Sequence, residues 1–413
     1  MNRQQQLLQL KEAITWDIVI IGGGATGLGT AVDAASRGYK TLLVEQYDFA
    51  KGTSSRSTKL VHGGVRYLEH GNMKLVKEAL RERGWLLKNA PHLTSVQAFV
   101  IPVRKWWQQW YYGIGLRLYD LLAGTLSLGK TRLLSAKETL ALVPALAPDK
   151  IKGGILYYDG QFDDSRLCID LASTAALHGA TVVNYCKVTD LIKEKKKIVG
   201  VQVQVGTDEE RLTIKARSVV NATGVFTDTI LKMDEPDAEN MVDPSQGVHL
   251  VVDAKHFPGT HALMIPKTDD KRVLFAVPWH NKVVIGTTDT PVDEILAEPL
   301  VLEEEVDYIL EHINRYLLPP IDRTNIKSVF AGLRPLVRSK EGKSTALLSR
   351  DHTIVVAPSG LVTITGGKWT TYRKMAQDAV DNAVFISKLD KRLCITKNLP
   401  VGDPLSVQQK KKR

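Results

Sequence analysis

The sequence predicts an α/β fold: a Rossmann-like domain built from separated pieces of the chain, with an antiparallel β-sheet domain inserted between them. Two observations predict it. The chain opens with an apolar run, a glycine turn, a helical stretch and a second apolar run, which is the order of a βαβ unit. Between residues 248 and 289, short β runs follow one another with turn residues between them, which is typical of antiparallel pairing.

The βαβ unit has the glycine spacing of a dinucleotide site. Residues 16–21 run into Gly22, Gly24 and Gly27, and the second apolar run ends at Glu45. Gly22 allows a tight turn, Gly24 lets the backbone approach a pyrophosphate, and Gly27 lets the helix pack close to the strand. The helix N-terminus favours phosphate, and Glu45 is placed to accept from ribose hydroxyls. The alternative is a glycine-rich turn in an ordinary α/β domain.

Two later strand-to-glycine turns favour FAD as the dinucleotide. Residues 218–221 and 361–365 each predict a short strand that enters a turn, and a helix is expected over 370–384. A large, extended flavin needs a site assembled from distant segments more than a nicotinamide cofactor does. Each later turn taken alone could equally be a plain loop. The predicted cofactor residues in these turns are Thr223, Gly224, Gly366 and Gly367.

Composition excludes several classes of protein. The 413 residues suffice for two or more domains, and 44% hydrophobic with 24% charged residues is a soluble globular balance. No apolar stretch reaches the ~18 residues that span a bilayer, and the N-terminus lacks the apolar core of a secretion signal. Three isolated cysteines, Cys168, Cys186 and Cys394, indicate a reducing compartment and no metal or dithiol chemistry.

The positive charge is concentrated in two segments. Residues 104–132 carry a net +4 and residues 386–413 a net +6, which together equal the formal charge of the chain, +10. The remainder is neutral, so a nucleic-acid binder is not expected. The basic residues 410–413 are most simply a solvated tail.

Residues 104–123 predict a helix with an aromatic face. Trp106, Trp110, Ile114 and Leu118 recur every four residues, beside basic residues. Basic residues with interfacial aromatics are typical of a helix that lies on a membrane surface. A core helix with the aromatics buried is the alternative, and the sequence leaves both open.

The remaining elements divide the chain between two predicted domains. Residues 73–90 predict an amphipathic helix and residues 303–317 another helix, with strand-like runs at 328–337 and 345–356. The β runs of the antiparallel sheet are 248–252, 262–266, 272–278 and 282–287. The cofactor-binding domain is expected to comprise residues 14–90, 150–240 and 335–388. The substrate domain is expected to comprise residues 91–149 and 241–334, and residues 389–413 form a tail.

Several polar groups lie beside turns rather than on solvated helix faces. They are Arg66, Tyr67, His249, Arg334 and Lys368, with Arg350 as a further candidate. Cations that converge on a flavin are costly unless they meet an anion, and a phosphorylated substrate would satisfy them. His249 has a pKa range suited to taking a hydroxyl proton. The plainer alternatives are that Arg350 pairs with Asp351 and that His249 is a satisfied strand residue.

Four motifs resemble those of the FAD-dependent glycerol-3-phosphate dehydrogenases. They are residues 62–69 (HGGVRYLE), 286–289 (GTTD), 332–336 (GLRPL) and 366–373 (GGKWTTYR). The resemblance runs in the same order from about residue 14 to about residue 400. It implies the broader D-amino-acid-oxidase-like flavoprotein class. It also implies oxidation of sn-glycerol 3-phosphate to dihydroxyacetone phosphate, with electrons passed to a membrane quinone.

The resemblance also implies residue roles. Substrate would be bound by Arg66, Tyr67, Arg334 and Lys368. His249 would be the base, with Arg334 and Arg350 as further catalytic residues near the reacting carbon. The expected cofactor contacts also include Thr53, Ser54, Ser55, His62 and Gly63. The implied location is cytoplasmic, attached peripherally to the inner face of the cell membrane.

Two features depart from the family pattern. Family members usually continue into a C-terminal helical domain, which is missing here because the chain stops soon after Asp403, so that the tail is truncated and a homodimer is left open. Trp369 stands where some relatives have Leu. Three alternatives remain: a glycerol-3-phosphate oxidase that reduces oxygen to hydrogen peroxide, an amino-acid oxidase, which the number of cations disfavours, and a flavin-binding module without turnover.

Overall fold

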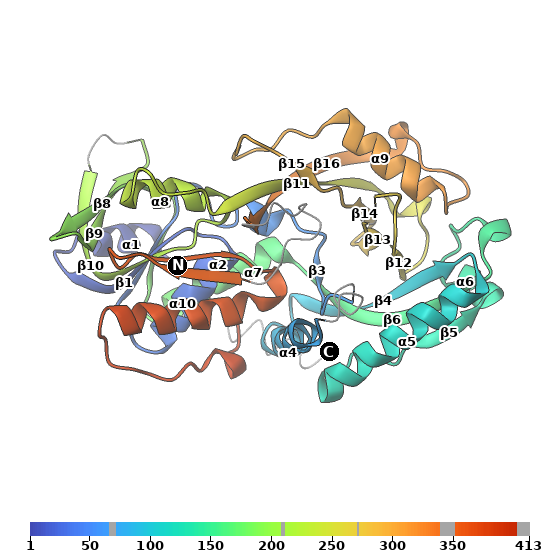
Figure 1. The fold of residues 1–413 in the computed structure, drawn as a ribbon, viewed down its shortest axis with the longest axis horizontal. Helices are drawn as coiled ribbons and strands as arrows, with labels where there is room; N and C mark the ends of the chain where they lie inside the picture. The colour runs from blue at the N-terminus through green and yellow to red at the C-terminus, as the bar shows by residue number, and fades with distance from the viewer. Residues whose placement is uncertain (66–71, 208–210, 271, 339–351, 403–413) are drawn as a thin grey trace.

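Two β-sheets form the frame of the structure (Figure 1). The computed structural model describes residues 1–65, 72–207, 211–270, 272–338 and 352–402. In these residues, eight strands form the first sheet and ten form the second. The chain passes back and forth between the sheets, so each sheet is assembled from segments that are far apart in the sequence.

The first sheet has a parallel centre. β1 (Thr15–Ile21) pairs in parallel with β2 (Thr41–Val44) and with β10 (Arg211–Asn221), and β10 pairs in parallel with β18 (Val362–Gly366). The other strands of this sheet are β7 (Thr181–Val183), β8 (Cys186–Glu194), β9 (Lys197–Val205) and β17 (His352–Val356). The carboxyl ends of β1, β10 and β18 therefore lie along one edge, and each is followed by one of the predicted glycine turns.

Three helices pack on one face of the first sheet. They are α2 (Ala25–Ser36), α7 (Asp164–Leu177) and α10 (Tyr372–Ile386), and their buried side chains form one core with alternate residues of β1. The intervening residues of β1 belong to a second core on the opposite face, together with β8 and β9. This alternation is the period of two expected for a strand covered on both faces.

The second sheet is mainly antiparallel, as predicted. The expected β runs form β11 (Val242–Asp253), β12 (Ala262–Ile265), β13 (Leu274–Trp279) and β14 (Lys282–Gly286), and β11 also pairs with β16 (Ile326–Val337). The other strands are β3 (Leu60–Val61), β4 (Thr94–Val103), β5 (Arg132–Ser135), β6 (Gly153–Phe162) and β15 (Thr290–Pro291). β6 lies within the range expected for the cofactor-binding domain, yet it pairs with β4 in this sheet. The domain boundaries themselves stay a prediction.

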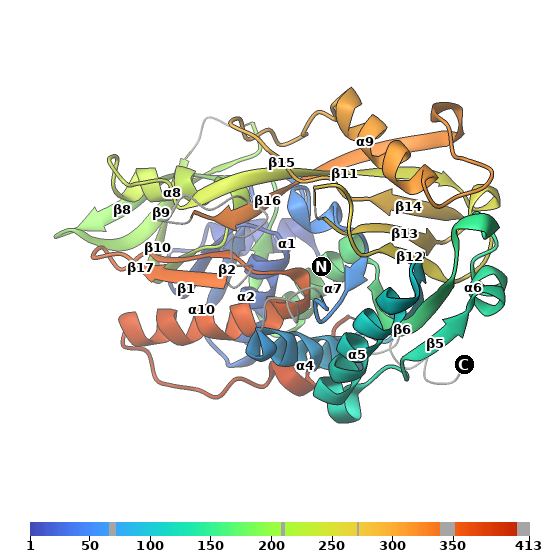
Figure 2. The ribbon, with the colours of Figure 1, turned by 45° about the vertical axis from the view of Figure 1, so that its right-hand side comes forward.

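Helices also cover the second sheet. α9 (Glu303–Asn314) contributes to a core with β11 and β14, while α4 (Met73–Asn89), α5 (Trp106–Ala123) and α6 (Ala136–Leu142) lie on the side of β4–β6 (Figure 2). α4, α5 and α9 correspond to the three helices predicted over 73–90, 104–123 and 303–317.

The tryptophans of α5 face away from the protein. The exposed fractions of Trp106, Trp107 and Trp110 are 75%, 49% and 56%. The helix packs through a different set of residues, Gly113, Leu116, Tyr119 and Ala123. The alternative of a core helix with buried tryptophans is therefore wrong.

The start of the chain and the segment after α10 both pack against the first sheet and its helices. α1 (Arg3–Leu10) lies at the edge strand β7, where the Gln6 side chain accepts a hydrogen bond from the Val182 N–H at 2.6 Å. After α10, Tyr39 donates to the Asp390 carbonyl at 2.6 Å, and Val401 N–H donates to the Asn89 carbonyl at 2.9 Å. Residues 389–402 of the predicted tail are thus packed on the domain rather than extended from it.

Candidate active site

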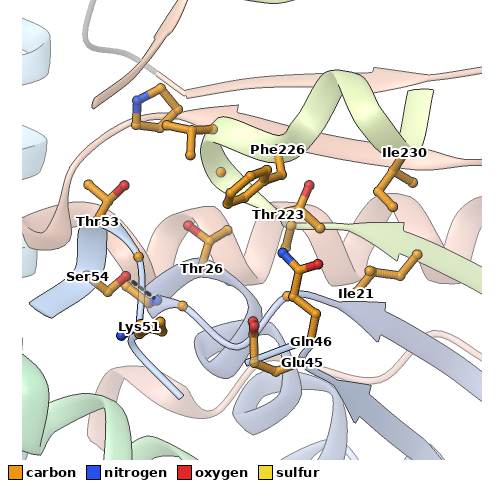
Figure 3. A pocket seen from close by; sticks show the side chains of 18 of the residues that line it. Ile21, Thr26, Glu45, Gln46, Lys51, Thr53, Ser54, Thr223, Phe226 and Ile230 are labelled. Atoms are coloured by element: carbon orange, nitrogen blue, oxygen red, sulfur yellow. Dashed lines mark hydrogen bonds between the residues drawn. The ribbon is translucent and has the colours of Figure 1, made fainter. Parts of the chain in front are cut away.

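A pocket lies where the carboxyl ends of the first sheet meet the N-terminus of α2 (Figure 3). Three turns that are distant in sequence line it together. The predicted cofactor residues in its wall are Gly22, Gly24, Glu45, Thr53, Ser54, Thr223, Gly224, Gly366 and Gly367, and the predicted substrate residue Lys368 lines it as well. Residues that the sequence did not single out, among them Thr26, Lys51 and Phe226, complete the wall.

Two glycines at the turn into α2, Gly22 and Gly27, occupy positions where a larger residue would not fit. Gly22 has φ +113°, and a Cβ there would lie 2.6 Å from the Ala222 carbonyl oxygen. A Cβ on Gly27 would lie 1.9 Å from the Gly22 carbonyl oxygen, so this glycine allows the close approach of helix to strand. Gly27 itself packs against the strand and is not part of the pocket wall.

Gly24 differs from its neighbours because its Cβ position faces mostly open space. A Cβ there would meet only the Ser54 Oγ, at 3.0 Å. The backbone of Gly24 is extended at φ −86°, which any residue can adopt. The space beside the helix N-terminus is therefore available to a diphosphate, and this open position fits the FAD that the motifs predict.

Ser54 and Trp369 link the loop after β2 to the helix and to the last glycine turn. The Ala25 N–H donates to Ser54 Oγ at 2.9 Å, so Ser54 caps α2. The Trp369 indole N–H donates to the Ser54 carbonyl at 2.8 Å, and its ring packs edge-on against Phe162 and Tyr372. The indole N–H of Trp369 therefore makes a contact that a Leu side chain could not.

The carboxylate of Glu45 is held by two backbone groups. Oε2 accepts from the Gly23 N–H at 2.6 Å and Oε1 accepts from the Tyr47 N–H at 2.7 Å. Burial raises the pKa of Glu45, and these hydrogen bonds oppose the rise. Each oxygen keeps a second lone pair, so both can still accept from ribose hydroxyls.

Residues 53–59 connect the pocket to the second sheet. Thr53 Oγ1 donates to the Leu333 carbonyl, and Arg56 Nη1 donates to the Ala331 carbonyl at 3.0 Å. Thr58 Oγ1 lies 2.8 Å from His249 Nε2, and Lys59 Nζ donates to Asp164 at 2.7 Å. The pocket loop and the predicted base thus belong to one hydrogen-bonded segment.

His249 is a buried, neutral imidazole on β11. It is 2% exposed, and its ring stacks on Phe330 with centroids 4.8 Å apart. Burial lowers the pKa of His249 to about 3, with further lowering by the positive charges of Arg334 and Lys59. Its Nδ1 has no hydrogen-bond partner among the residues that the structure describes. The imidazole is therefore unprotonated at neutral pH, and its pKa lies well below the range expected from the sequence for a group that takes a hydroxyl proton.

Arg334 lies on β16, beside the loop that follows β14. Its Nη2 donates to Thr287 Oγ1 at 2.9 Å and to the Thr288 carbonyl at 3.0 Å. Its Nη1 lies 3.4 Å from Asp289 Oδ1 and donates to the Gln246 carbonyl at 3.3 Å. The GTTD motif is thus the loop that orients this arginine.

The remaining predicted residues are placed differently. Arg66, Tyr67 and Arg350 lie outside the described residues. The backbone of His62 exchanges hydrogen bonds with Thr370 Oγ1, at 3.2 and 3.1 Å, which ties it to the turn after Lys368. Gly63 donates its N–H to the Tyr119 hydroxyl at 2.7 Å, and Ser55 donates to the Gly52 carbonyl. His62, Gly63 and Ser55 are not part of the pocket wall described above.

No group of His, Cys, Asp and Glu side chains in the described residues could hold a metal ion, and the cysteines are free thiols. No helix in this part of the chain combines the length and the apolar character needed to cross a membrane.

Comparison with known proteins shows which family the chain resembles. Residues 17–373 match the model of the FAD dependent oxidoreductase family. The chain is 46% identical over 397 residues to the mitochondrial glycerol-3-phosphate dehydrogenase of Arabidopsis thaliana, covering 93% of this chain and 63% of that protein. It is 44% identical over 398 residues to the mitochondrial glycerol-3-phosphate dehydrogenase of Bos taurus, covering 93% of this chain and 55% of that protein.

A solved structure is similar over almost the whole chain. The glycerol-3-phosphate dehydrogenase of Bacillus halodurans, complexed with FAD, superposes with a TM-score of 0.81 at 34% identity. The match covers 99% of this chain and 72% of that one. The chain thus spans a little over half the length of the two curated relatives and about three quarters of the bacterial one.

Proposed function

The chain belongs to the FAD-dependent oxidoreductase family, and from that premise we propose that it oxidises sn-glycerol 3-phosphate to dihydroxyacetone phosphate and passes the electrons to a membrane quinone. FAD is the cofactor. The observation that carries the proposal is His249, a buried neutral base joined through Thr58 to the loop that lines the FAD pocket. The names of relatives at 44–46% identity support the choice of substrate.

His249 takes the proton of the C2 hydroxyl. With its pKa near 3 it is unprotonated at neutral pH, and one ring nitrogen keeps a lone pair. When bound, FAD supplies a two-electron acceptor for the hydride that leaves C2. The proton on His249 and the hydride together account for the two hydrogens lost when an alcohol becomes a ketone.

The cations hold the oxygens of the substrate. Arg334 is fixed by the loop after β14 and stabilises negative charge at the reacting oxygen, while Lys368 reaches the site from the last glycine turn. Arg66, Tyr67 and Arg350 are proposed for the phosphate and the reacting carbon on the family resemblance alone. A phosphate group would add charge-assisted hydrogen bonds to these cations.

The protein attaches to the membrane surface from which quinone is reached. Support comes from α5, which exposes three tryptophans beside Arg104 and Lys105. The names of both curated relatives place those proteins in mitochondria. The inner face of the cell membrane stays the proposal for this chain, and a homodimer stays an open alternative.

Anaerobic mixing with two alcohols tests the proposal. We expect glycerol 3-phosphate to bleach the FAD-loaded protein, and glycerol, which lacks the phosphate, to leave it yellow. We expect a quinone to reoxidise the bleached protein faster than oxygen does, which separates a dehydrogenase from an oxidase. Equal bleaching by both alcohols, or bleaching by neither, contradicts the proposal.

A further inference from the structure

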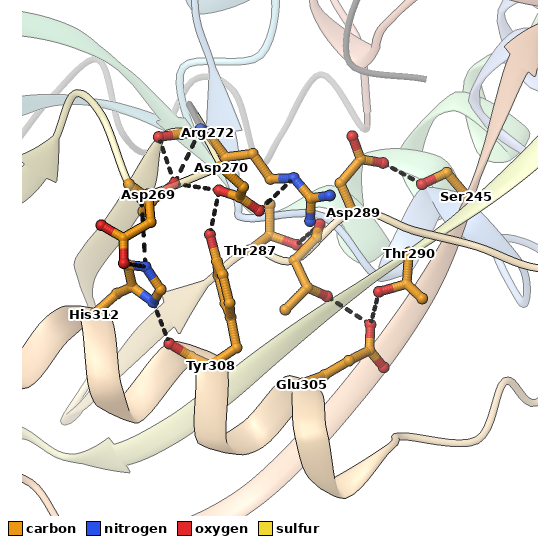
Figure 4. A network of polar contacts seen from close by, with 12 residues as sticks. Ser245, Asp269, Asp270, Arg272, Thr287, Asp289, Thr290, Glu305, Tyr308 and His312 are labelled. Atoms are coloured by element: carbon orange, nitrogen blue, oxygen red, sulfur yellow. Dashed lines mark hydrogen bonds and ion pairs between the residues drawn. The ribbon is translucent and has the colours of Figure 1, made fainter. Parts of the chain in front are cut away.

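Glu305 is a buried carboxylate at the start of α9 whose partners are neutral. It is 4% exposed, and no cation of the described residues forms an ion pair with it. Its Oε1 accepts from Thr290 Oγ1 at 2.8 Å (Figure 4). Oε1 also accepts from Thr288 Oγ1 at 2.8 Å, and Oε2 accepts from Gln246 Nε2 at 2.7 Å. A buried charge is costly unless it is hydrogen-bonded, so these contacts hold three side chains firmly.

Two of these three side chains belong to residues that also hold Arg334. The carbonyl of Thr288 accepts from Arg334 Nη2 at 3.0 Å, and the carbonyl of Gln246 accepts from Arg334 Nη1 at 3.3 Å. Glu305 is therefore connected to the Arg334 guanidinium through Thr288 and, separately, through Gln246. The third partner, Thr290, lies on the short strand β15.

Thr288 also connects Glu305 to the strand of the proposed base. Its hydroxyl donates to Glu305, which turns the oxygen lone pairs toward β11, and the Val248 N–H donates to that oxygen at 2.9 Å. Val248 directly precedes His249. The Glu305 carboxylate therefore orients two groups of Thr288: the hydroxyl, which accepts a hydrogen bond from β11, and the carbonyl, which accepts one from Arg334.

We propose that Glu305 is a positioning residue for the oxidation of glycerol 3-phosphate: it fixes the loop at Thr288 and Gln246 so that Arg334 keeps the orientation in which it binds the reacting oxygen. The inference rests on the proposed function, because it needs Arg334 to act on substrate. Glu305 Oε2 also accepts from the Leu302 N–H at 3.3 Å, which caps α9. Capping alone does not account for the hydrogen bonds to Thr288 and Gln246.

A double-mutant cycle tests the coupling. We expect Glu305→Gln to lower kcat/KM for anaerobic flavin reduction by about tenfold, in the range seen for residues that share partners, with FAD content unchanged. In an Arg334→Ala background the same change should cost less than about twofold, because the group that Glu305 positions is gone. Equal losses in both backgrounds would overturn the proposal, and so would no loss in the native background.

Three further variants separate positioning from folding. Glu303→Gln is the matched control, since it removes an exposed carboxylate from the same helical turn and should leave reduction unchanged. Thr288→Val should reproduce the loss and Thr288→Ser, which keeps the hydroxyl, should restore activity, whatever the folding of the Glu305 variant. A Thr288→Val protein as active as wild type would overturn the proposal. If the wild-type protein is not reduced by glycerol 3-phosphate at all, the proposed function fails instead.

Discussion

At the scale of single residues, the chemistry of His249 is decided by its surroundings. The side chain is enclosed between Thr58 and Phe330, and the charges of Arg334 and Lys59 add to the effect of burial. Burial and the nearby cations disfavour the protonated imidazole, so His249 stays neutral across the physiological pH range. The same surroundings should make His249 lower the free energy of unfolding at low pH.

Replacing His249 should slow the reaction without emptying the FAD pocket. We expect His249→Ala to lower the rate of anaerobic flavin reduction by roughly 10²- to 10⁴-fold, the usual cost of losing a general base. FAD content should stay near that of wild type, because His249 is not in the pocket wall. Stopped-flow absorbance measures the rate, and an unchanged rate would remove His249 from the mechanism.

The pKa of His249 also predicts how stability depends on pH. The folded pKa of about 3 lies below the unfolded value of 6.5, so between these values the unfolded chain binds more protons. Stability is therefore lost as the pH falls through this window. From pH 7 to pH 5 the loss from this residue is roughly 2 kcal/mol.

Urea unfolding of the wild type and of His249→Asn at both pH values checks this linkage. The variant should lose less free energy of unfolding than the wild type on going to pH 5. The comparison within each protein cancels the pH-independent cost of losing the contact with Thr58. Parallel losses in the two proteins would mean that His249 titrates normally in the fold.

The site residues stay a prediction, but the structure shows what signal the sequence held for each. Lys368 follows a glycine turn and lines the pocket, whereas His249 and Arg334 lie within the strands β11 and β16 rather than beside turns. Thr58 and Glu305 gave no such signal. Their importance comes from partners that are distant in the sequence. Thr58 and His249, for example, are 191 positions apart, and such pairings exist only once the sheets have formed.

At the scale of elements, the glycines at the turn into α2 are constrained in different ways, so their substitution should have different effects. Gly24→Val should fold, since its backbone is extended and only the Ser54 hydroxyl is near, but the side chain should occupy the space of the diphosphate. We expect purified Gly24→Val to have a melting temperature close to that of the wild-type apoprotein and little bound FAD.

Gly27→Val is the matched control for this turn. Its Cβ would lie 1.9 Å from a carbonyl oxygen, so the helix must move away from the strand. Overpacking of this kind costs about 1–3 kcal/mol or more, so the melting temperature should fall with or without FAD. If Gly24→Val purifies with full flavin, the diphosphate does not lie beside Gly24.

The elements with strong periodicity were predicted well, but not every pairing between strands was. Helices over 73–90 and 303–317 and the β runs after residue 248 appear close to their expected places. The membership of β6 in the second sheet was missed because pairing with β4 is set by tertiary contacts, not by local pattern. The orientation of α5 was left open for the same reason, since a helical period does not say which face is covered.

The exposed face of α5 predicts membrane attachment in two parts. Near an anionic surface each basic residue contributes about 1 kcal/mol and is screened by salt, whereas inserted tryptophans are not. We expect high salt to release part of the protein from anionic vesicles, and replacement of Trp106, Trp107 and Trp110 by Gln to abolish the rest. Vesicle flotation measures both.

A variant elsewhere on the surface controls for loss of exposed apolar area. Phe385 is 80% exposed near the end of α10, and Phe385→Gln should bind vesicles as the wild type does. Equal loss in the Phe385 variant and the tryptophan variant would show that α5 is not the contact. Failure of the wild type to bind anionic vesicles at low salt contradicts the attachment itself.

At the scale of the whole molecule, two sheets meet around one segment. Residues 53–59 line the FAD pocket at one end and contact His249, the proposed base, at the other. The comparisons confirm the predicted family and the FAD-binding fold. The motifs allowed the family and the fold to be predicted from the sequence, because their order along the chain reflects the order in which the chain crosses between the two sheets.

The central claim is that this molecule moves a hydride from C2 of glycerol 3-phosphate to its flavin. Anaerobic single-turnover mixing with glycerol 3-phosphate, followed by assay of the product, tests it most directly. The account predicts one dihydroxyacetone phosphate for each flavin bleached, and slower bleaching when C2 carries deuterium. A flavin that stays oxidised at saturating substrate, or one that bleaches without forming dihydroxyacetone phosphate, would contradict it.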